Sequence, residues 1–294
     1  MDQAEQLRNI IKASNNPPKP LARVLTVTSG KGGVGKSNTS INLAIQFRKM
    51  GQRVVILDAD FGLANIEIMF GAVPKYNLSD FIYEGKSIDE IITKGPMGVN
   101  FISGGSGISS LSNLTQDHIH SIVQGLSVLD SLADTIIVDT GAGISDAVME
   151  FLVASGEILL VTTPEPTSIT DSYSLLKALS MHPKYAREET KIKMIANKVH
   201  ESGEGKELYK KLKVVVEKYL KTPMEYLGEV PEDTYLVKAV MQQKPVSMAD
   251  PYAKSATAYK QIAAKLVNKD VVEKVNRRGL AAFFSNIFVG KGRV

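Results

Sequence analysis

The sequence of 294 residues contains no cysteine and only four histidines, which are scattered along the chain. Without cysteine, disulfide frameworks, thiolate zinc sites, iron–sulfur clusters and thiol nucleophiles are excluded together. A histidine-rich metal site is also not expected. No apolar run reaches the roughly 18 residues that a membrane-spanning helix needs, and the N-terminus lacks a signal-peptide pattern. We therefore expect a cytoplasmic protein.

Most of the chain also lacks an excess of positive charge. The net charge is +4, but residues 260–294 alone hold eight lysines and arginines against two acidic residues, a balance of +6. The preceding residues therefore carry a net charge of −2. Because the basic character belongs to the C-terminal tail, a broad basic surface for nucleic acid is not indicated.

Short apolar segments alternate with amphipathic ones along most of the chain. We predict strands at residues 24–28, 54–57, 99–102, 136–138, 158–161, 192–196 and 224–227. We predict helices at residues 37–50, 115–132, 145–154, 167–180, 206–220, 235–241 and 253–269. Nearly continuous apolar strands are typical of strands covered on both faces. The alternation therefore predicts an α/β fold, with a doubly wound, mainly parallel sheet in a single domain.

A glycine-rich segment carries the most specific chemical signal. Residues 30–37 match the pattern G-x-x-x-x-G-K-[ST], with a predicted strand before them and a predicted helix after them. In such a loop, backbone N–H groups surround phosphates, the lysine neutralises the β and γ oxygens, and the serine hydroxyl binds Mg²⁺. We predict a nucleotide site made of Gly30, Lys31, Gly32, Gly33, Val34, Gly35, Lys36, Ser37 and Asn38.

A second lysine, Lys31, lies inside this loop, although one nucleotide requires only one. The run K-G-G-x-G-K-S that begins at Lys31 resembles the deviant Walker A signature of the MinD/ParA ATPases. The resemblance implies that Lys31 reaches the phosphates of a partner subunit, so that the site is complete only in an ATP-bound homodimer. Lys31 would then act like an arginine finger. Without the family, Lys31 is a solvated loop lysine.

Two predicted strands end in acidic residues, Asp58 with Asp60 after one and Asp139 after the other. The carboxyl ends of strands in such sheets face the ligand crevice. The resemblance assigns Asp58 and Asp139, with the Ser37 hydroxyl, to Mg²⁺. It assigns Asp60, in a D-x-D-x-G-L-x-N pattern completed by Asn65, to orienting or deprotonating the attacking water. The alternative is that these acids are solvated charges at strand ends.

Two downstream segments resemble the family's base-binding elements. Asn197 follows a predicted strand and resembles the asparagine that recognises adenine, and Pro231, Glu232 and Asp233 resemble the loop that flanks the base. Alone, each segment is an ordinary loop sequence. His200 stands where the guanine-reading pattern N-K-x-D requires its acid, so the sequence favours ATP over GTP. The expected cofactors are ATP and Mg²⁺.

The C-terminal segment has the pattern of an interfacial membrane helix. One predicted helix face, flanked by basic residues, carries Leu280, Phe283, Phe284, Ile287 and Phe288. Aromatic side chains would enter the acyl boundary and basic residues would meet anionic headgroups. Two copies on an ATP-bound dimer would bind more tightly by avidity. The alternative is a terminal helix docked on the protein's own core, and both hold if docking depends on the nucleotide.

The N-terminal segment indicates a branch of the family. Residues 2–8 read D-Q-A-E-Q-L-R and resemble the D-Q-A-x-x-L-R element of the FlhG group, also called YlxH or FleN, which helps to set flagellar number and placement. The resemblance places Gln3 nearest the nucleotide site of the SRP-type GTPase FlhF, with Leu7 and Arg8 docking the arm. A proline-rich linker would project this arm from the body. The alternative is a disordered tail.

These patterns predict three parts: an activator arm and linker (1–20), an ATPase domain of MinD-like P-loop type (21–268) and a membrane-targeting tail (269–294). We expect a dimerising, membrane-cycling ATPase in which Lys31, Lys36 and Asp60 are catalytic. Expected partners are a second copy, the anionic inner membrane surface, FlhF and flagellar C-ring components, but not nucleic acid. The alternatives are a MinD-like division-site regulator, a ParA-like partitioning ATPase that binds DNA, and a module that uses nucleotide only structurally.

Overall fold

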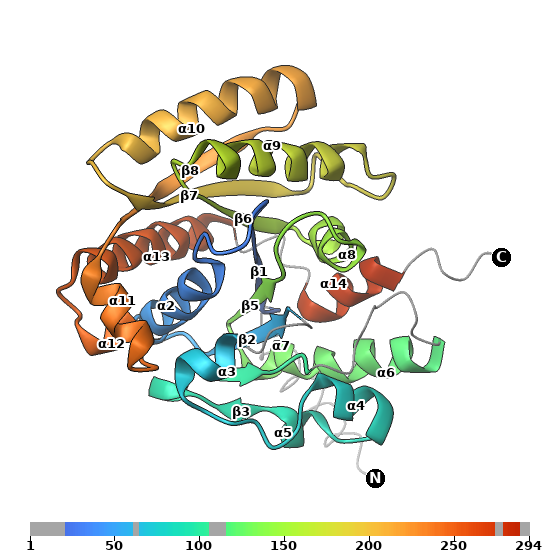
Figure 1. Cartoon of the computed structure of the whole chain (residues 1–294). Coiled ribbons are helices and arrows are strands. Elements are labelled where there is room, and N and C mark those ends of the chain that lie inside the picture. Colours follow the sequence, from blue (N-terminus) through green and yellow to red (C-terminus); the bar gives the residue numbers. More distant parts are fainter. Residues whose placement is uncertain (1–20, 61–64, 106–115, 274–278, 289–294) are drawn as a thin grey trace, which may run out of the picture.

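The computed structural model describes residues 21–60, 65–105, 116–273 and 279–288 (Figure 1). One eight-stranded sheet runs through the molecule in the order β3-β4-β2-β5-β1-β6-β7-β8. Neighbouring strands pair in parallel except β3 and β4, which are antiparallel. The strands are β1 (Arg23–Thr28), β2 (Val54–Ala59), β3 (Thr93–Lys94), β4 (Asn100–Ile102), β5 (Thr135–Thr140), β6 (Glu157–Thr162), β7 (Lys191–Val199) and β8 (Met224–Pro231). The predicted doubly wound, mainly parallel sheet is confirmed.

Helices cover both faces of the sheet. One face carries α2 (Lys36–Lys49), α3 (Asn65–Phe70), α11 (Thr234–Met241), α12 (Val246–Ala249) and α13 (Lys254–Glu273). The other carries α4 (Leu78–Glu84), α5 (Ile88–Ile91), α6 (Gln116–Ser127), α7 (Leu129–Leu132), α8 (Asp146–Ala154), α9 (Pro166–Met181), α10 (Glu204–Val215) with its π-helical extension η3 (Val216–Leu220), and α14 (Gly279–Phe288). A 3₁₀ turn, η1 (Pro96–Gly98), precedes β4.

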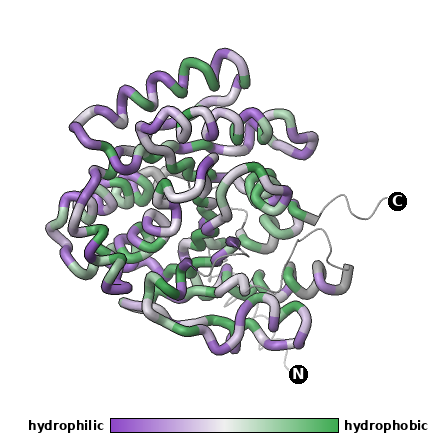
Figure 2. The backbone as a smooth tube through the Cα atoms, viewed as in Figure 1, coloured by the Kyte–Doolittle hydropathy of each residue, from purple (hydrophilic) through white to green (hydrophobic). Residues whose placement is uncertain are grey.

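Alternating side chains of the central strands supply the two cores. Leu25 and Val27 of β1 pack on the α2 and α13 side, and Val55 and Leu57 of β2 pack on the opposite side. Figure 2 shows the resulting distribution: hydrophobic residues are concentrated in the strands, and hydrophilic residues lie on the outer sides of the helices. Of the helices that the structure describes, none combines the length and the apolar character needed to cross a bilayer.

The structure differs from the predicted elements in several places. The predicted helix over 115–132 is divided into α6 and α7, and the predicted strand at 224–227 continues to Pro231 as β8. The antiparallel strand β3 and the short helices α3, α4, α5 and α12 lack a separate signal in the sequence. Short elements of this kind owe their conformation to tertiary packing and caps more than to periodicity. Asn77, for example, caps α4 by accepting from Ser79 and Asp80 backbone N–H groups.

Candidate functional site

The glycine-rich loop connects the end of β1 to the first residue of α2, as the sequence predicts. Gly33 and Gly35 have φ values of +75° and +96°, in the left-handed region that favours glycine. A Cβ atom on Gly30 would lie 2.2 Å from the Asp171 backbone of α9, and one on Gly35 would lie 2.2 Å from the Asn197 amide nitrogen. The glycines are therefore required both by backbone conformation and by close approach of α9 and β7.

Two sources of positive charge lie at the end of the loop, the Lys36 ammonium group and the N-terminus of α2. Lys36 is buried, and burial lowers the pKa of its ammonium group, whereas the negative charges of Asp139 and Asp60 oppose that shift. Gly35 offers no side-chain cap, and the first turn of α2 holds no acidic residue. Uncapped N–H groups at a helix N-terminus, together with a buried lysine, make a site suited to phosphate.

Two carboxylates lie beside this positive end. The register of β2 and β5 pairs Asp58 directly with Asp139, and both side chains are buried. Burial, followed by the charge of Asp139, raises the pKa of Asp58 to about 8. Burial also raises the pKa of Asp139 to about 6, although hydrogen bonds from Ser37 and Ser40 oppose the shift. Two buried, adjacent carboxylates are unfavourable without a compensating cation.

The donor set fits Mg²⁺. One oxygen of Asp139 accepts a hydrogen bond from the Ser40 hydroxyl at 2.7 Å, and its other oxygen, Oδ2, is buried without a hydrogen-bond partner. Within the described ranges, no three histidine or acidic side chains group closely enough to bind a metal by themselves. Mg²⁺ commonly takes one or two carboxylates and completes its shell with water and phosphate oxygens. The structure thus brings Ser37, Asp58 and Asp139 together as the sequence predicts.

Asp60 lies at the same edge of the sheet, next to the loop after β5. Its carboxylate accepts a hydrogen bond from the Asn65 amide at 3.4 Å, and a Cβ atom on Gly141 would lie 3.5 Å from it. The intervening positions of the predicted D-x-D-x-G-L-x-N pattern, 62 and 63, lie outside the described residues. The place of Asp60 beside both acidic strand ends is compatible with its predicted role toward water, which stays a prediction.

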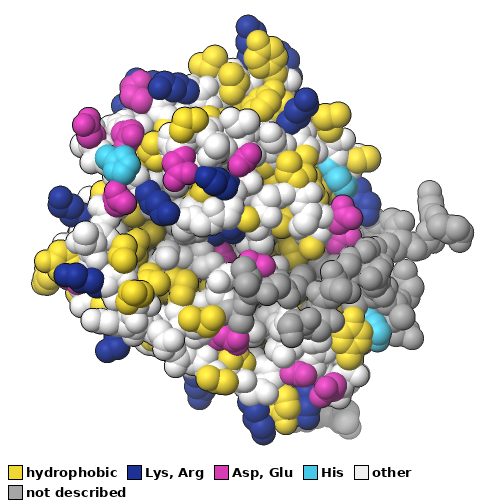
Figure 3. Space-filling model, viewed as in Figure 1, with side chains coloured by type: hydrophobic (Ala, Val, Ile, Leu, Met, Phe, Trp, Pro, Cys, Tyr) yellow, Lys and Arg dark blue, Asp and Glu magenta, His cyan; other side chains and the backbone are white. Residues whose placement is uncertain are grey.

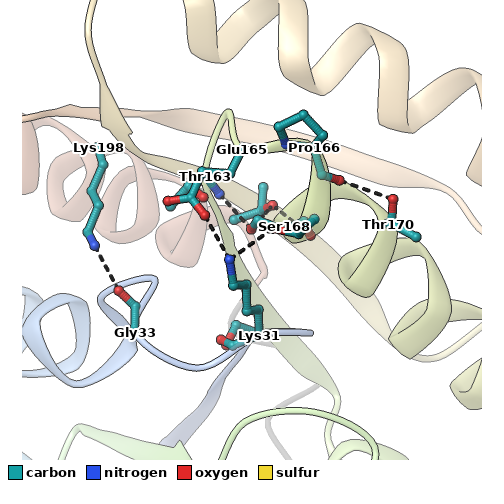
Figure 4. Close-up of polar contacts among 11 residues, drawn as sticks. Lys31, Gly33, Thr163, Glu165, Pro166, Ser168, Thr170 and Lys198 are labelled. Atoms are coloured by element: carbon teal, nitrogen blue, oxygen red, sulfur yellow. Dashed lines mark hydrogen bonds and ion pairs between the residues drawn. The ribbon is translucent and has the colours of Figure 1, made fainter.

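Lys31 is bound within its own chain. Its ammonium group donates to the Glu165 carboxylate at 2.8 Å and to the Thr167 hydroxyl at 2.9 Å, at the beginning of α9 (Figure 4). In the single chain, Lys31 is therefore engaged in an exposed intramolecular ion pair rather than being a freely solvated lysine. Glu165 and Thr167 were not predicted, because a separation of 134 and 136 residues leaves no local signal of their contact with Lys31.

Of the residues predicted to bind the base, Asn197 contacts the phosphate loop, whereas Pro231, Glu232 and Asp233 make their contacts elsewhere. The buried Asn197 amide donates to the Val34 carbonyl at 2.7 Å, whereas its Oδ1 is buried without a partner. Pro231 ends β8, and the exposed Glu232 carboxylate lies 3.0 Å from His200. The Asp233 carboxylate caps α11 through the Tyr235 N–H and also accepts two hydrogen bonds from Ser255. Asp233 thus has a clear structural role, and its predicted part in flanking the base stays a prediction.

The predicted membrane helix is docked on the protein's own core. Leu280, Phe283, Phe284 and Ile287 of α14 are buried, and Phe151 of α8 stacks on Phe283 with ring centroids 6.0 Å apart. The Asp130 carboxylate accepts from the Leu280 N–H at 2.8 and 3.0 Å, which caps the first turn of α14. The structure thus shows the docked alternative. The side chain of Phe288 and the predicted arm residues Gln3, Leu7 and Arg8 lie outside what the structure describes.

A parallel sheet whose central strand feeds a glycine-rich loop and a helix, with acids on the neighbouring strand ends, defines a P-loop NTPase. The ParA family model, described as NUBPL iron-transfer P-loop NTPase, matches residues 21–267. The antiactivator FleN of Pseudomonas aeruginosa is 38% identical over 262 residues, which cover 89% of this chain and 91% of FleN. The flagellum site-determining protein YlxH of Helicobacter pylori is 34% identical over an alignment that covers 97% of this chain and 98% of YlxH.

A solved structure shares the fold at greater sequence distance. The septum site-determining protein MinD from Pyrococcus horikoshii, complexed with Mg-ADP, superposes with a TM-score of 0.67 at 21% identity, covering 87% of this chain and all of that one. The chain belongs to the ParA/MinD family of P-loop NTPases.

Proposed function

We propose that the protein is an ATP-dependent switch that dimerises on ATP, moves between cytoplasm and membrane, and regulates the number or placement of flagella. The observation that carries this proposal is helix α14. Its apolar, aromatic face is buried against the NTPase domain, and its sequence is flanked by basic residues as in an interfacial membrane helix. The names of FleN and YlxH, an antiactivator and a flagellum site-determining protein, support the flagellar part.

The nucleotide would bind through the loop N–H groups and the Lys36 ammonium. Ser37, Asp58 and Asp139 would hold Mg²⁺, which neutralises phosphate charge when it is bound. The MinD relative in its Mg-ADP complex supports this choice of ligands. Asp60 would orient the attacking water beside Gly141, at the edge where both acidic strands end.

Lys31 supports dimer-dependent hydrolysis. In the single chain its ammonium group is engaged by Glu165 and Thr167, both exposed at the beginning of α9. An exposed ion pair of this kind is worth little, about 0–1 kcal/mol, so a phosphate from a second subunit could compete for the lysine. Turnover would therefore be slow in the monomer and faster in an ATP-bound dimer.

Release of α14 would couple the nucleotide to the membrane. Undocking exposes Leu280, Phe283, Phe284 and Ile287 beside the basic tail, and two copies on one dimer would bind an anionic surface by avidity. On the face shown in Figure 3, lysine and arginine side chains are interspersed with aspartate and glutamate. The residues before 260 carry a net charge of −2 against +6 in the tail, a balance that favours a membrane role of the tail over a ParA-like DNA-binding body.

The experiment that tests this proposal is sedimentation with anionic liposomes, comparing ADP with ATP in an Asp60→Ala background designed to slow hydrolysis. The matched control lacks residues 279–294. ATP-dependent pelleting that disappears in the truncated chain supports the membrane switch. Absence of pelleting in both nucleotide states, combined with ATP-dependent DNA retention, supports a partitioning ATPase instead.

The arm would supply the link to a partner. Deleting residues 1–20 should leave ATP binding and dimerisation unchanged while abolishing stimulation of the SRP-type GTPase FlhF, measured as GTP turnover. Loss of dimerisation in this deletion would instead make the arm a structural element. Flagellar C-ring components are the further partners that this function predicts.

A further inference from the structure

Strand β7 departs from regular pairing at its carboxyl end. Its register against β8 shifts between Asn197 and Val199, and the intervening Lys198 has a φ of +55°. Left-handed backbone costs a residue with a side chain roughly 1–2 kcal/mol. Strained residues of this kind persist where the surrounding structure holds them, and they cluster at functional positions.

The irregularity directs two consecutive side chains to the phosphate loop. Asn197 donates from Nδ2 to the Val34 carbonyl at 2.7 Å, and Lys198 donates from Nζ to the Gly33 carbonyl at 2.8 Å (Figure 4 shows the second contact). In a regular strand, successive side chains point to opposite faces of the sheet. The shift in register therefore explains how neighbouring residues can both reach one loop.

These contacts constrain two peptide planes of the loop. A trans peptide unit is planar, so its N–H points away from its carbonyl oxygen, and the described residues contain no cis bond. Holding the Gly33 carbonyl toward β7 turns the Val34 N–H away from β7. Holding the Val34 carbonyl does the same for the Gly35 N–H. Gly33 and Gly35 both have positive φ and, because glycine lacks a Cβ atom, they have the greatest backbone freedom, so these planes benefit most from an external constraint.

We propose that Lys198 is a positioning residue for the phosphate loop. Its ammonium group fixes the Gly33–Val34 peptide plane so that the Val34 N–H is oriented for a nucleotide phosphate before the nucleotide arrives. Asn197 fixes the next plane in the same way, in addition to any contact with a base. This role rests on the proposed nucleotide-binding function.

The test compares Lys198 with a second lysine of the same backbone conformation. Lys221 has a φ of +52° and is exposed at the end of η3, so it provides the control for strain and for loss of one charge. We would measure Mg-ADP affinity by calorimetry in Lys198→Met, Lys198→Gly and Lys198→Arg, and in Lys221→Met and Lys221→Gly. We expect about five- to tenfold weaker binding for Lys198→Met and Lys198→Gly, recovery in Lys198→Arg, and no change at Lys221.

Two further readouts separate positioning from other roles. Lys198→Gly relieves backbone strain, so thermal stability should not fall in parallel with affinity. At about 1 M salt, where the Debye length is about 3 Å, the affinity ratio of wild type to Lys198→Met should persist. A ratio that collapses in high salt would mean that Lys198 acts only by attracting phosphate, which overturns the proposal. Unchanged affinity in Lys198→Met at low salt overturns it as well.

Failure of the proposed function can be distinguished from failure of this inference. If the wild-type chain binds neither ADP nor ATP, the nucleotide-binding function fails. Hydrogen exchange in the nucleotide-free protein then still tests the positioning role. Faster exchange across residues 31–38 in Lys198→Met, without a change in Lys221→Met, supports it, and equal exchange in both contradicts it.

Discussion

Replacing Asp130 by alanine should weaken the docking of α14. The Asp130 carboxylate accepts the Leu280 N–H with both oxygens, at 2.8 and 3.0 Å, at a helix end where negative charge is favoured. Loss of a helix-capping carboxylate costs about 1–2 kcal/mol. That change shifts the docking equilibrium roughly 5- to 30-fold toward the released helix. We therefore expect faster hydrogen exchange in residues 279–288 and increased liposome pelleting in ADP, without ATP.

A neighbouring aspartate provides the control. Asp134 accepts hydrogen bonds from Arg53 at 2.7 and 2.8 Å, in the connection between α7 and β5, so Asp134→Ala removes comparable contacts. Gly279→Ala should act like Asp130→Ala, because its Cβ would lie 2.5 Å from the Asp130 carboxylate at a φ of +67°. Unchanged exchange in α14 of Asp130→Ala would refute the capping argument. Faster exchange without pelleting would keep the cap but refute the membrane role of α14.

Three further predictions concern the body of the domain. In the metal-free protein, burial and Asp139 raise the folded-state pKa of Asp58 to about 8, above its unfolded value of about 3.9, so the free energy of unfolding falls as pH rises through that interval. Asp58→Asn should abolish this pH-dependent fall, because asparagine does not ionise. Urea unfolding from about pH 5 to 9 measures the difference. Glu157→Gln should lower the free energy of unfolding by about 3–5 kcal/mol, because it leaves the buried cations of Arg23 and Lys193 without their carboxylate. An unchanged midpoint in urea unfolding would contradict this. Gly30→Ala should cost about 1–3 kcal/mol by the same assay, whereas Gly32→Ala should be tolerated, because its Cβ would meet only Ala142 at 4.0 Å.

The sheet and the phosphate site follow from local sequence. Apolar strands, the loop pattern and the acids at strand ends are each contained in a few consecutive residues, and parallel register then brings Asp58 and Asp139 together. The Lys31–Glu165 contact joins residues 134 positions apart, so it depends on how α9 lies over the loop. Similarly, the helical periodicity of the sequence identifies the apolar face of α14, but it does not show what covers that face. The same apolar side chains can be buried either in a bilayer or against the protein's own core.

Helix α8 relates the nucleotide site to α14 physically. It begins directly after the loop that follows Asp139, where the Ser145 hydroxyl caps its first turn by accepting the Val148 N–H. One and a half turns later it presents Phe151, whose ring packs against both Phe283 and Phe284 at 6.0 and 6.4 Å. A shift of the loop after β5 on binding a γ-phosphate would therefore be transmitted to α8, which together with α6 and α7 forms the surface on which α14 packs. Because close-packed side chains lose part of their attraction when a small gap opens between them, such a movement would weaken the contacts of Phe151 with α14.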